Sequence, residues 1–320
     1  MKNHPVAIFS GSGNPPLTEA ICNSLGQEQG IARIWRFPDG EKCVRLESDV
    51  RGRDCFIVQP TCSPVDENLV ELLIFLDCLR RASAARVTAV MPYFGYARQD
   101  RKDAGRVPIT AKMVANLIAA AGAERVLSID MHAKQLQGFF DIPLDHLTAE
   151  PVIVEYLRNK HLSDLTVVAP DVGNMKTASR YASALHAELA IINKRRISGS
   201  EVVCEEVIGN VKDRNIVMCD DMISTGGTIA GAAAMVKSRG AKKIYVGATH
   251  GVFCESALDK LGQSPLEEII VTDTIPLREE AGRELKNIKI LSVAKLLGEA
   301  ISRIHKNESL SKMFEEFSGT

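Results

Sequence analysis

The chain has 320 residues, about twice the usual length of one domain, so we expect two domains. Hydrophobic residues make up 45% and charged residues 25%, which is typical of folded proteins and excludes a disordered or collagen-like chain. The formal net charge is −1, and the lack of a basic excess argues against general nucleic-acid binding. The most apolar run, Leu69–Leu76, is too short to span a bilayer and contains Glu71.

The N-terminus and the cysteines indicate the cellular setting. The first residues contain no long apolar segment followed by a small-residue cleavage site, so the sequence predicts no signal peptide. Eight cysteines are spread along the chain without a C-x-x-C pair, which fits neither a disulfide framework nor a clustered zinc site. We therefore expect reduced thiols in a cytoplasmic protein.

Short apolar runs alternate with segments of helical period along the first half of the chain. The apolar runs predict strands, and the longer periodic segments predict helices. In chain order we expect a strand at Val6–Phe9, a proline-opened helix at Pro15–Leu25, a strand at Cys55–Val58, a helix at Asn68–Leu79, a strand at Val87–Met91, a helix at Thr110–Ala121 and a strand at Val126–Ile129.

The alternation restarts after about residue 150, and Glu150-Pro151 is the best boundary between domains. Here we expect strands at Leu165–Ala169, Leu189–Ile192, Ile216–Cys219, Ile244–Ala248 and Ile269–Val271. Strands separated by crossover helices form right-handed parallel units. The sequence therefore predicts an α/β protein of two similar domains, 1–149 and 150–320, each a parallel β-sheet flanked by helices. The last helix could pack back on the first domain.

The most informative segment is 216–228, where an apolar strand leads into two acids and a Thr-Gly-Gly-Thr turn. Ligands of parallel sheets bind beyond the carboxyl ends of the strands. The turn can present N–H groups and hydroxyls to a phosphate at a helix N-terminus, where the dipole favours an anion. Asp220 and Asp221 can accept hydrogen bonds from sugar hydroxyls or bind magnesium through water. An acidic turn with a threonine N-cap is the structural alternative.

This segment resembles the phosphoribosyl-diphosphate loop of the type I phosphoribosyltransferases. The resemblance implies a ribose-5-phosphate site formed by Asp220, Asp221, Ser224, Thr225, Gly226, Gly227 and Thr228. The loop alone does not separate an enzyme that transfers phosphoribosyl to a base from the enzyme that makes the diphosphate donor.

The N-terminal half separates these two possibilities. The segment from Asp130 to Phe140 resembles the signature of the ribose-phosphate pyrophosphokinases. Asp130 and His132 flank one residue at a predicted strand end, so both could project towards one cleft; a capping aspartate and a structural histidine are the alternative. By resemblance, His132 and Asp130 hold Mg²⁺ on the ATP phosphates. Asp171, at a further strand end, is expected to be a second magnesium contact.

Two segments of the same half resemble the ATP-binding parts of this family. The stretch 37–41 resembles the adenine-binding loop, in which an aromatic face stacks and acids meet the exocyclic amine. The stretch 93–102 resembles the ATP-phosphate segment, although a solvated mixed-charge loop is the alternative. The implied ATP-binding residues are Phe37, Asp39, Gly40, Glu41, Arg98, Gln99 and Lys102.

Lys194-Arg195-Arg196 precedes a short polar stretch and resembles the catalytic loop of the family. The resemblance implies that Lys194 and Arg196 close over the transferred phosphates and that Arg196 also binds ribose-5-phosphate. Three places depart from the family pattern. Ser224 replaces an aspartate, Asn174-Met175-Lys176 replaces a Gly-rich stretch ending in arginine, and Cys254-Glu255 replaces small residues.

The resemblance also implies an allosteric site for phosphate and ADP, built partly from Arg51, Gln137, Asp145, Ser309 and Ser311. In that neighbourhood Lys134 and His146 replace the usual serine and asparagine. We therefore expect activation by inorganic phosphate with an altered concentration dependence.

The activity implied by the resemblance is transfer of the β,γ-diphosphate of ATP to the C1 hydroxyl of ribose-5-phosphate for nucleotide biosynthesis. The products are phosphoribosyl diphosphate and AMP, and the cofactor is Mg²⁺. The family assembles as hexamers, so we expect a cytoplasmic homohexamer without nucleic-acid or membrane partners. A salvage phosphoribosyltransferase and a catalytically silent regulatory homologue are the alternatives.

Overall fold

The computed structural model describes residues 4–198, 201–311 and 313, and for 194–198 and 201–205 it describes the backbone alone. The chain divides into two compact units. Unit 1 comprises Met1–Thr148, Thr274–Pro276 and Ser292–Thr320, and unit 2 comprises Ala149–Asp273 and Leu277–Leu291. The chain thus returns to unit 1 twice after Thr148, at Thr274–Pro276 and from Ser292 onward.

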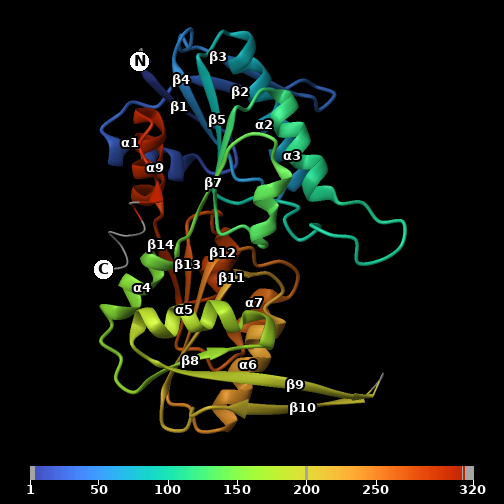
Figure 1. The fold of residues 1–320 in the computed structure, drawn as a ribbon, viewed down its shortest axis with the longest axis vertical. Helices are drawn as coiled ribbons and strands as arrows, with labels where there is room; N and C mark the ends of the chain where they lie inside the picture. Colours follow the sequence, from blue (N-terminus) through green and yellow to red (C-terminus); the bar gives the residue numbers. More distant parts are fainter. Residues whose placement is uncertain (1–3, 199–200, 312, 314–320) are drawn as a thin grey trace. The chain divides into compact units, whose positions relative to one another are not determined.

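Unit 1 is built on a parallel sheet whose strands follow the order β1-β4-β5-β6-β7 (Figure 1). All of β4 is buried, as expected for a parallel strand covered by helices on both faces. The strands are β1 (Val6–Ser10), β4 (Asp54–Val58), β5 (Arg86–Met91), β6 (Arg125–Ile129) and β7 (Leu144–Leu147).

Helices cover both faces of this sheet. Figure 1 shows α1 (Pro15–Leu25) and α9 (Ala294–Lys306) on one side, and α2 (Val65–Arg81) and α3 (Thr110–Ala121) on the other. Helix α1 begins with two prolines, and the Asn14 side chain accepts a hydrogen bond from the Leu17 N–H. It ends at Gly26, whose φ of +62° suits glycine at the end of a helix.

A hairpin of β2 (Ala32–Arg36) and β3 (Lys42–Leu46) adds a small antiparallel sheet to unit 1. Ala32, Ile34, Val44 and Leu46 are partly buried against the main core of the unit. The hairpin was not predicted from the sequence. The unit also contains a 3₁₀ helix, η1 (Lys134–Phe139), between β6 and β7.

Unit 2 contains a larger sheet of order β10-β9-β8-β11-β12-β13-β14, in which only the β9–β10 pairing is antiparallel among the described residues (Figure 1). Strand β11 is central, between β8 and β12. The strands are β8 (Leu165–Ala169), β9 (Glu188–Ser198), β10 (Glu201–Ile208), β11 (Asn215–Ile223), β12 (Ile244–Gly251), β13 (Glu268–Thr272) and β14 (Ile288–Leu291).

Two apolar cores sandwich the sheet of unit 2, because helices pack on each of its faces. One core includes α4 (Glu150–Arg158) and α5 (Met175–Leu185), and the other includes α6 (Gly227–Ser238) and α7 (Ala257–Gly262). A short 3₁₀ helix, η2 (Val172–Asn174), precedes α5, and α8 (Glu279–Glu284) packs on α7. Parallel sheets flanked by helices in both units confirm the predicted fold class.

Two negative findings concern the described residues. None of their helices has the length and apolar character needed to cross a bilayer. Every described cysteine, which means all except Cys204, has a free thiol.

Candidate active site

Strand β11 carries the acidic pair to the carboxyl edge of the unit 2 sheet. The strand continues to Ile223, so Asp220 and Asp221 lie inside its last part. From the sequence we had expected them to come after the strand. Register supports this, because Asp220 pairs with Ala248 and Met222 with His250 on β12. The phosphate-binding turn therefore begins at Ser224, directly after a strand that β12 supports as far as Ile223.

The turn 224–228 leads directly into α6. Gly226 is the N-cap of α6 with a φ of +71°, and a Cβ there would lie 3.2 Å from Leu261 Cγ. Both constraints require glycine at this position. The residues from Met222 to Ile229, together with Asp220, line a cavity of about 110 Å³. The N-terminus of α6 and the predicted residues Thr225, Gly227 and Thr228 thus surround a space suited to a phosphate group.

A second acid meets Asp220 at the same edge of the sheet. Asp171 follows β8, the neighbour of β11, and its Oδ1 accepts a hydrogen bond of 3.0 Å from the Asn174 backbone N–H. The Asn174 side-chain amide donates to Asp220 Oδ1 at 3.0 Å. Asp220 Oδ1 also accepts from the Asp221 N–H at 2.9 Å. Asn174, noted from sequence only as a departure from the family, joins the two acids.

The acidic surroundings change the ionisation of Asp220. Burial, followed by the negative charges of Asp221 and Asp171, raises the pKa of Asp220 from 3.8 to about 7. Carboxylates gathered in this way are stabilised by donors or cations that neutralise them. The site is therefore suited to sugar hydroxyls and to a hard cation.

Ser224 and Cys254, which both depart from the family pattern, are in contact. Ser224 Oγ lies 3.1 Å from Cys254 Sγ, and the Cys254 N–H donates to the Ser224 carbonyl at 3.1 Å. The segment after β12 thereby holds the first residue of the phosphate turn. The sequence gave no reason to expect that these two departures are neighbours.

Lys194 and Arg196 were expected at the start of a polar loop. Their backbone instead lies in β9, where Lys194 pairs with Glu205 and Arg196 with Val203 of β10. The expectation of a loop at these two positions is wrong, because the antiparallel pairing with β10 extends the strand to Ser198. The side chains of Lys194 and Arg196, and the residues 199–200, lie outside the described part of the chain.

In unit 1, the predicted adenine-binding residues form the tip of the β2–β3 hairpin. The Phe37 N–H donates to the Glu41 carbonyl at 2.9 Å, and Gly40, with a φ of +96°, closes the turn by donating to the Phe37 carbonyl. Asp39 Oδ1 accepts from the Glu41 N–H at 3.2 Å. The Phe37 side chain is 47% exposed and meets Trp35 edge-on at 6.4 Å between ring centroids. An exposed aromatic face is available for stacking.

The predicted ATP-phosphate segment forms a long connection between β5 and α3. Tyr93, Phe94 and Ala97 are buried, which anchors the segment, while Arg98, Gln99 and Lys102 are exposed. Thr110, the first residue of α3, donates its hydroxyl hydrogen to the Gln99 side chain. The buried residues thus fix the segment, and Arg98 and Lys102 face the solvent.

The predicted metal residues of unit 1 lie at the end of the neighbouring strand, β6. Asp130 adopts a φ of +36° and its N–H donates to the Leu147 carbonyl on β7 at 3.0 Å, and His132 is exposed. Gln135, at the start of η1, donates to Asp100 Oδ2 at 2.6 Å. This hydrogen bond joins the segment after β6 to the segment after β5, so the structure brings the two predicted ATP-phosphate regions together.

The predicted allosteric residues lie in three parts of unit 1. Arg51, before β4, donates to Ser83 Oγ at 3.3 Å. Gln137 contacts His146 Nδ1 at 3.2 Å, and Asp145 forms an ion pair with Arg125 at 2.5 Å. Ser309 and Ser311 follow α9, and Ser309 Oγ accepts from the Ser311 N–H.

Two family models match the chain. Residues 6–122 match the N-terminal domain of ribose phosphate pyrophosphokinase, and residues 197–315 match the phosphoribosyl synthetase-associated domain. The ribose-phosphate pyrophosphokinase of Rhodopirellula baltica is 52% identical over 97% of this chain and 98% of its own length. The chain belongs to the ribose-phosphate pyrophosphokinase family.

Further relatives support this assignment. The ribose-phosphate pyrophosphokinase of Ralstonia nicotianae is 46% identical over 99% of this chain and its full length. The crystal structure of phosphoribosylpyrophosphate synthetase from Mycobacterium smegmatis superposes with a TM-score of 0.89 at 38% identity, covering 95% of this chain and 99% of the other. The family and the enzyme class predicted from the motifs, a ribose-phosphate diphosphokinase, are confirmed.

One residue of the candidate site and one buried charge of unit 1 were missed from the sequence. Asn174 was recognised only as a departure, although its place three residues after Asp171 is the spacing of a capping contact. Glu71 was noted only because it interrupts an apolar run. A charged residue among buried apolar neighbours is the signal that could have directed attention to it, because such a charge needs partners.

Proposed function

We propose that this pyrophosphokinase transfers the diphosphate of ATP to the C1 hydroxyl of ribose-5-phosphate, giving phosphoribosyl diphosphate and AMP. The observation that carries the proposal is the phosphate turn 224–228 beside Asp220, Asp221 and Asp171, in a chain that matches its pyrophosphokinase relatives over nearly its whole length. A salvage phosphoribosyltransferase would leave the hairpin tip and the exposed cations of unit 1 without a role.

In unit 2, the turn binds the 5-phosphate of the sugar. The N-terminal N–H groups of α6 and the hydroxyls of Ser224, Thr225 and Thr228 donate to the phosphate oxygens. Asp220 and Asp221 accept hydrogen bonds from the ribose hydroxyls, which orients the C1 hydroxyl. Arg196 and Lys194 supply positive charge where charge develops on the transferred diphosphate.

In unit 1, the nucleotide is bound by groups on three segments. Phe37 stacks on adenine, and Asp39 and Glu41 accept from its exocyclic amine. Arg98 and Lys102 bind the phosphates, and Gln99 helps to shape this segment. The reaction depends on in-line positioning and charge neutralisation, and no general base is required.

The residues present fit Mg²⁺. Asp220, Asp221 and Asp171 offer carboxylate oxygens, and a divalent cation would offset the burial and the mutual repulsion that raise the pKa of Asp220. No three acidic, histidine or cysteine side chains of the described ranges converge on one point, which leaves most ligand positions to water and phosphate oxygens, as is usual for Mg²⁺. In unit 1, His132 and Asp130 would hold Mg²⁺, and in unit 2 Asp171 would be a second magnesium contact. When bound, Mg²⁺ would neutralise charge on the diphosphate.

The test is AMP formation from ATP and ribose-5-phosphate in the presence of Mg²⁺. We expect AMP and phosphoribosyl diphosphate in equal amounts, and none when ribose-5-phosphate is omitted or a chelator is in excess. Unchanged AMP formation in excess chelator would reject the metal role of Asp171 and His132. Consumption of phosphoribosyl diphosphate with a free base, without ATP turnover, would indicate a salvage enzyme, and no turnover at all would indicate a silent homologue.

The proposal also covers setting and regulation. By analogy with the family, the enzyme acts in the cytoplasm as a homohexamer and responds to phosphate and ADP through Arg51, Gln137, Asp145, Ser309 and Ser311. Sedimentation of the purified protein tests the hexamer, and titration of the activity with inorganic phosphate tests the regulation.

A further inference from the structure

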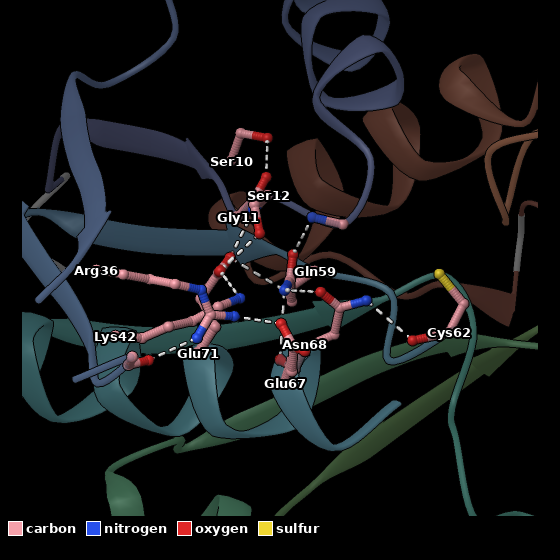
Figure 2. A network of polar contacts seen from close by, with 12 residues as sticks. Ser10, Gly11, Ser12, Arg36, Lys42, Gln59, Cys62, Glu67, Asn68 and Glu71 are labelled. Atoms are coloured by element: carbon pink, nitrogen blue, oxygen red, sulfur yellow. Dashed lines mark hydrogen bonds and ion pairs between the residues drawn. The ribbon is translucent and has the colours of Figure 1, made fainter. Parts of the chain in front are cut away.

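A buried carboxylate in unit 1 has no role in the chemistry proposed above. Glu71 lies on α2, its side chain is fully buried, and it accepts hydrogen bonds from three residues (Figure 2). The Ser12 N–H and hydroxyl donate at 2.6 Å each, Gln59 Nε2 at 3.1 Å and Lys42 Nζ at 2.5 Å. Replacing a buried ion pair with apolar residues often costs no stability. Stability alone therefore does not explain the charge.

The partner of Glu71 is the residue that ends the proposed adenine-binding turn. Lys42 is the first residue of β3, immediately after Glu41, and its side chain is only 11% exposed. Its cross-strand partner Arg36 is the last residue of β2, immediately before Phe37. The two cations therefore stand at the two ends of the turn 37–41.

Arg36 forms a second, more exposed ion pair one helical turn away. It forms an ion pair with Glu67, which precedes Glu71 by four residues and so lies on the same face of α2 (Figure 2). Arg36 Nη1 also donates to the Gly40 carbonyl at 2.7 Å, within the turn itself. Each end of the turn is thus tied to one face of one helix.

The face of the hairpin towards α2 changes from apolar to charged side chains along its length. Alternate residues of a strand point to one face. On this face the first two cross-strand pairs are apolar and partly buried against the core, namely Ala32 with Leu46 and Ile34 with Val44. The third pair is Arg36 with Lys42. Apolar packing therefore holds the base of the hairpin, and ion pairs hold the end that carries the turn.

A cavity separates this end of the hairpin from the helix. Its volume is about 410 Å³, and its lining includes Trp35, Arg36 and Lys42 from the hairpin and Glu67 and Glu71 from α2. Because side chains do not fill this space by direct packing, the two ion pairs bridge it. Loss of one pair would leave that end of the turn without its tie to α2.

We propose that Lys42–Glu71 and Arg36–Glu67 form a clamp that positions the turn 37–41 for the adenine nucleotide. Glu71 and Lys42 are positioning residues, since they act through the turn and do not touch the nucleotide. The proposal rests on the proposed function in one respect, which is the assignment of adenine to this turn. Without the clamp, nucleotide binding must first order the turn, which weakens binding without changing the chemical step.

The test uses Lys42→Met, which keeps the length of the side chain and removes its charge, and Lys42→Arg, which retains the charge. Arg33→Met is the matched control, because Arg33 lies on the same hairpin, is 71% exposed and pairs with Glu47 away from the turn. We expect Lys42→Met to raise the KM for ATP about fivefold or more, with kcat and the KM for ribose-5-phosphate nearly unchanged. Lys42→Arg should restore most of the affinity, and the control should behave as wild type.

A second variant removes the effect of an unpaired buried charge. In Lys42→Met/Glu71→Gln no charge is left buried without a partner, so folding stability should recover relative to Lys42→Met. If the clamp positions the turn, the KM for ATP should stay raised in the double variant. If Lys42 serves stability alone, the KM for ATP should return to the wild-type value with the melting temperature, which would overturn the proposal.

The single tryptophan gives a readout that does not depend on activity. Trp35 lies in the hairpin next to Phe37, so its fluorescence anisotropy reports motion of this region. We expect faster local motion in Lys42→Met than in wild type without any nucleotide. Equal anisotropy decays would overturn the clamp whatever the activity is. Faster motion with an unchanged KM for ATP would instead show that the turn does not bind the nucleotide, and so contradict both the positioning role and the adenine assignment.

Discussion

The raised pKa of Asp220 predicts that the ionised carboxylate destabilises the folded enzyme when no substrate is bound. The pKa of Asp220 is raised from 3.8 to about 7 by burial and by the nearby charges of Asp221 and Asp171. Between these two pH values an unfolded chain releases this proton while the folded chain keeps it. Unfolding is therefore favoured progressively as the pH rises from about 4 to about 7, and the full cost is present above pH 7.

The change we consider is Asp220→Asn, which cannot ionise and keeps the oxygen that accepts from Asn174 and from the Asp221 N–H. A pKa difference of 1 corresponds to about 1.4 kcal/mol. Ionisation of Asp220 therefore lowers the free energy of unfolding of the wild type by up to about 4 kcal/mol. We expect the variant to be more stable than wild type by about 2 kcal/mol at pH 5 and by about 4 kcal/mol at pH 8.

The assay is urea unfolding at pH 5 and pH 8 without Mg²⁺, ATP or ribose-5-phosphate. Asp259→Asn, which changes an exposed carboxylate of the same unit, should leave the free energy of unfolding nearly unchanged at both pH values. Asp220→Asn should also raise the KM for ribose-5-phosphate, because a ribose hydroxyl loses its ionised acceptor. An equal difference in stability at the two pH values, or a variant no more stable than wild type at pH 8, would refute the reasoning.

Three further substitutions have defined outcomes. Lys194→Ala should lower kcat about a hundredfold or more with smaller changes in KM, because one charge-stabilising group is lost, and steady-state kinetics measure this. Ser224→Asp should change the KM for ribose-5-phosphate by about fivefold at most and leave the KM for ATP unaltered; abolished activity would mean that the contact with Cys254 is essential for the turn. Arg86→Met should cost about 3 kcal/mol in urea unfolding, because Asp54, whose side chain is 4% exposed, would lose its bidentate partner.

The regular part of the fold could be predicted because its parallel strands are largely apolar. The helices at Pro15–Leu25 and Thr110–Ala121 and the strand at Leu165–Ala169 were predicted with the bounds that the structure has. The first helix is marked locally by proline at its start and glycine at its end, and the strand by a mostly apolar run with two valines. Such signals need no knowledge of distant partners.

The antiparallel elements were missed because their pairing is not local. Strands β2 and β3 mix apolar residues with arginine and lysine without regular alternation, and such a mixture is also typical of a solvated loop. Strand β9 extends to Ser198 only because β10 pairs with it, so Lys194 and Arg196 were expected in a loop. Strand β11 likewise extends past Asp220 because β12 supports it to Ile223.

The motifs identified the candidate site residues, and the structure adds the contacts between them. Asp220 and Asp171 come from strands that are adjacent in the sheet although far apart in sequence, and Asn174 joins them. No pattern in the sequence indicates that Ser224 meets Cys254, because the two lie 30 residues apart on separate segments. Side-chain partners of this kind follow from tertiary packing, which periodicity does not encode.

The most direct measurement follows the C1 oxygen of ribose-5-phosphate. With ATP, Mg²⁺ and substrate carrying ¹⁸O at C1, we expect phosphorus NMR to show the label in the bond between C1 and the diphosphate, because the C1 hydroxyl attacks the β-phosphorus of ATP. AMP should form in the same amount as the labelled product. Release of phosphate or diphosphate from ATP without a labelled phosphoribosyl diphosphate would contradict the proposed reaction.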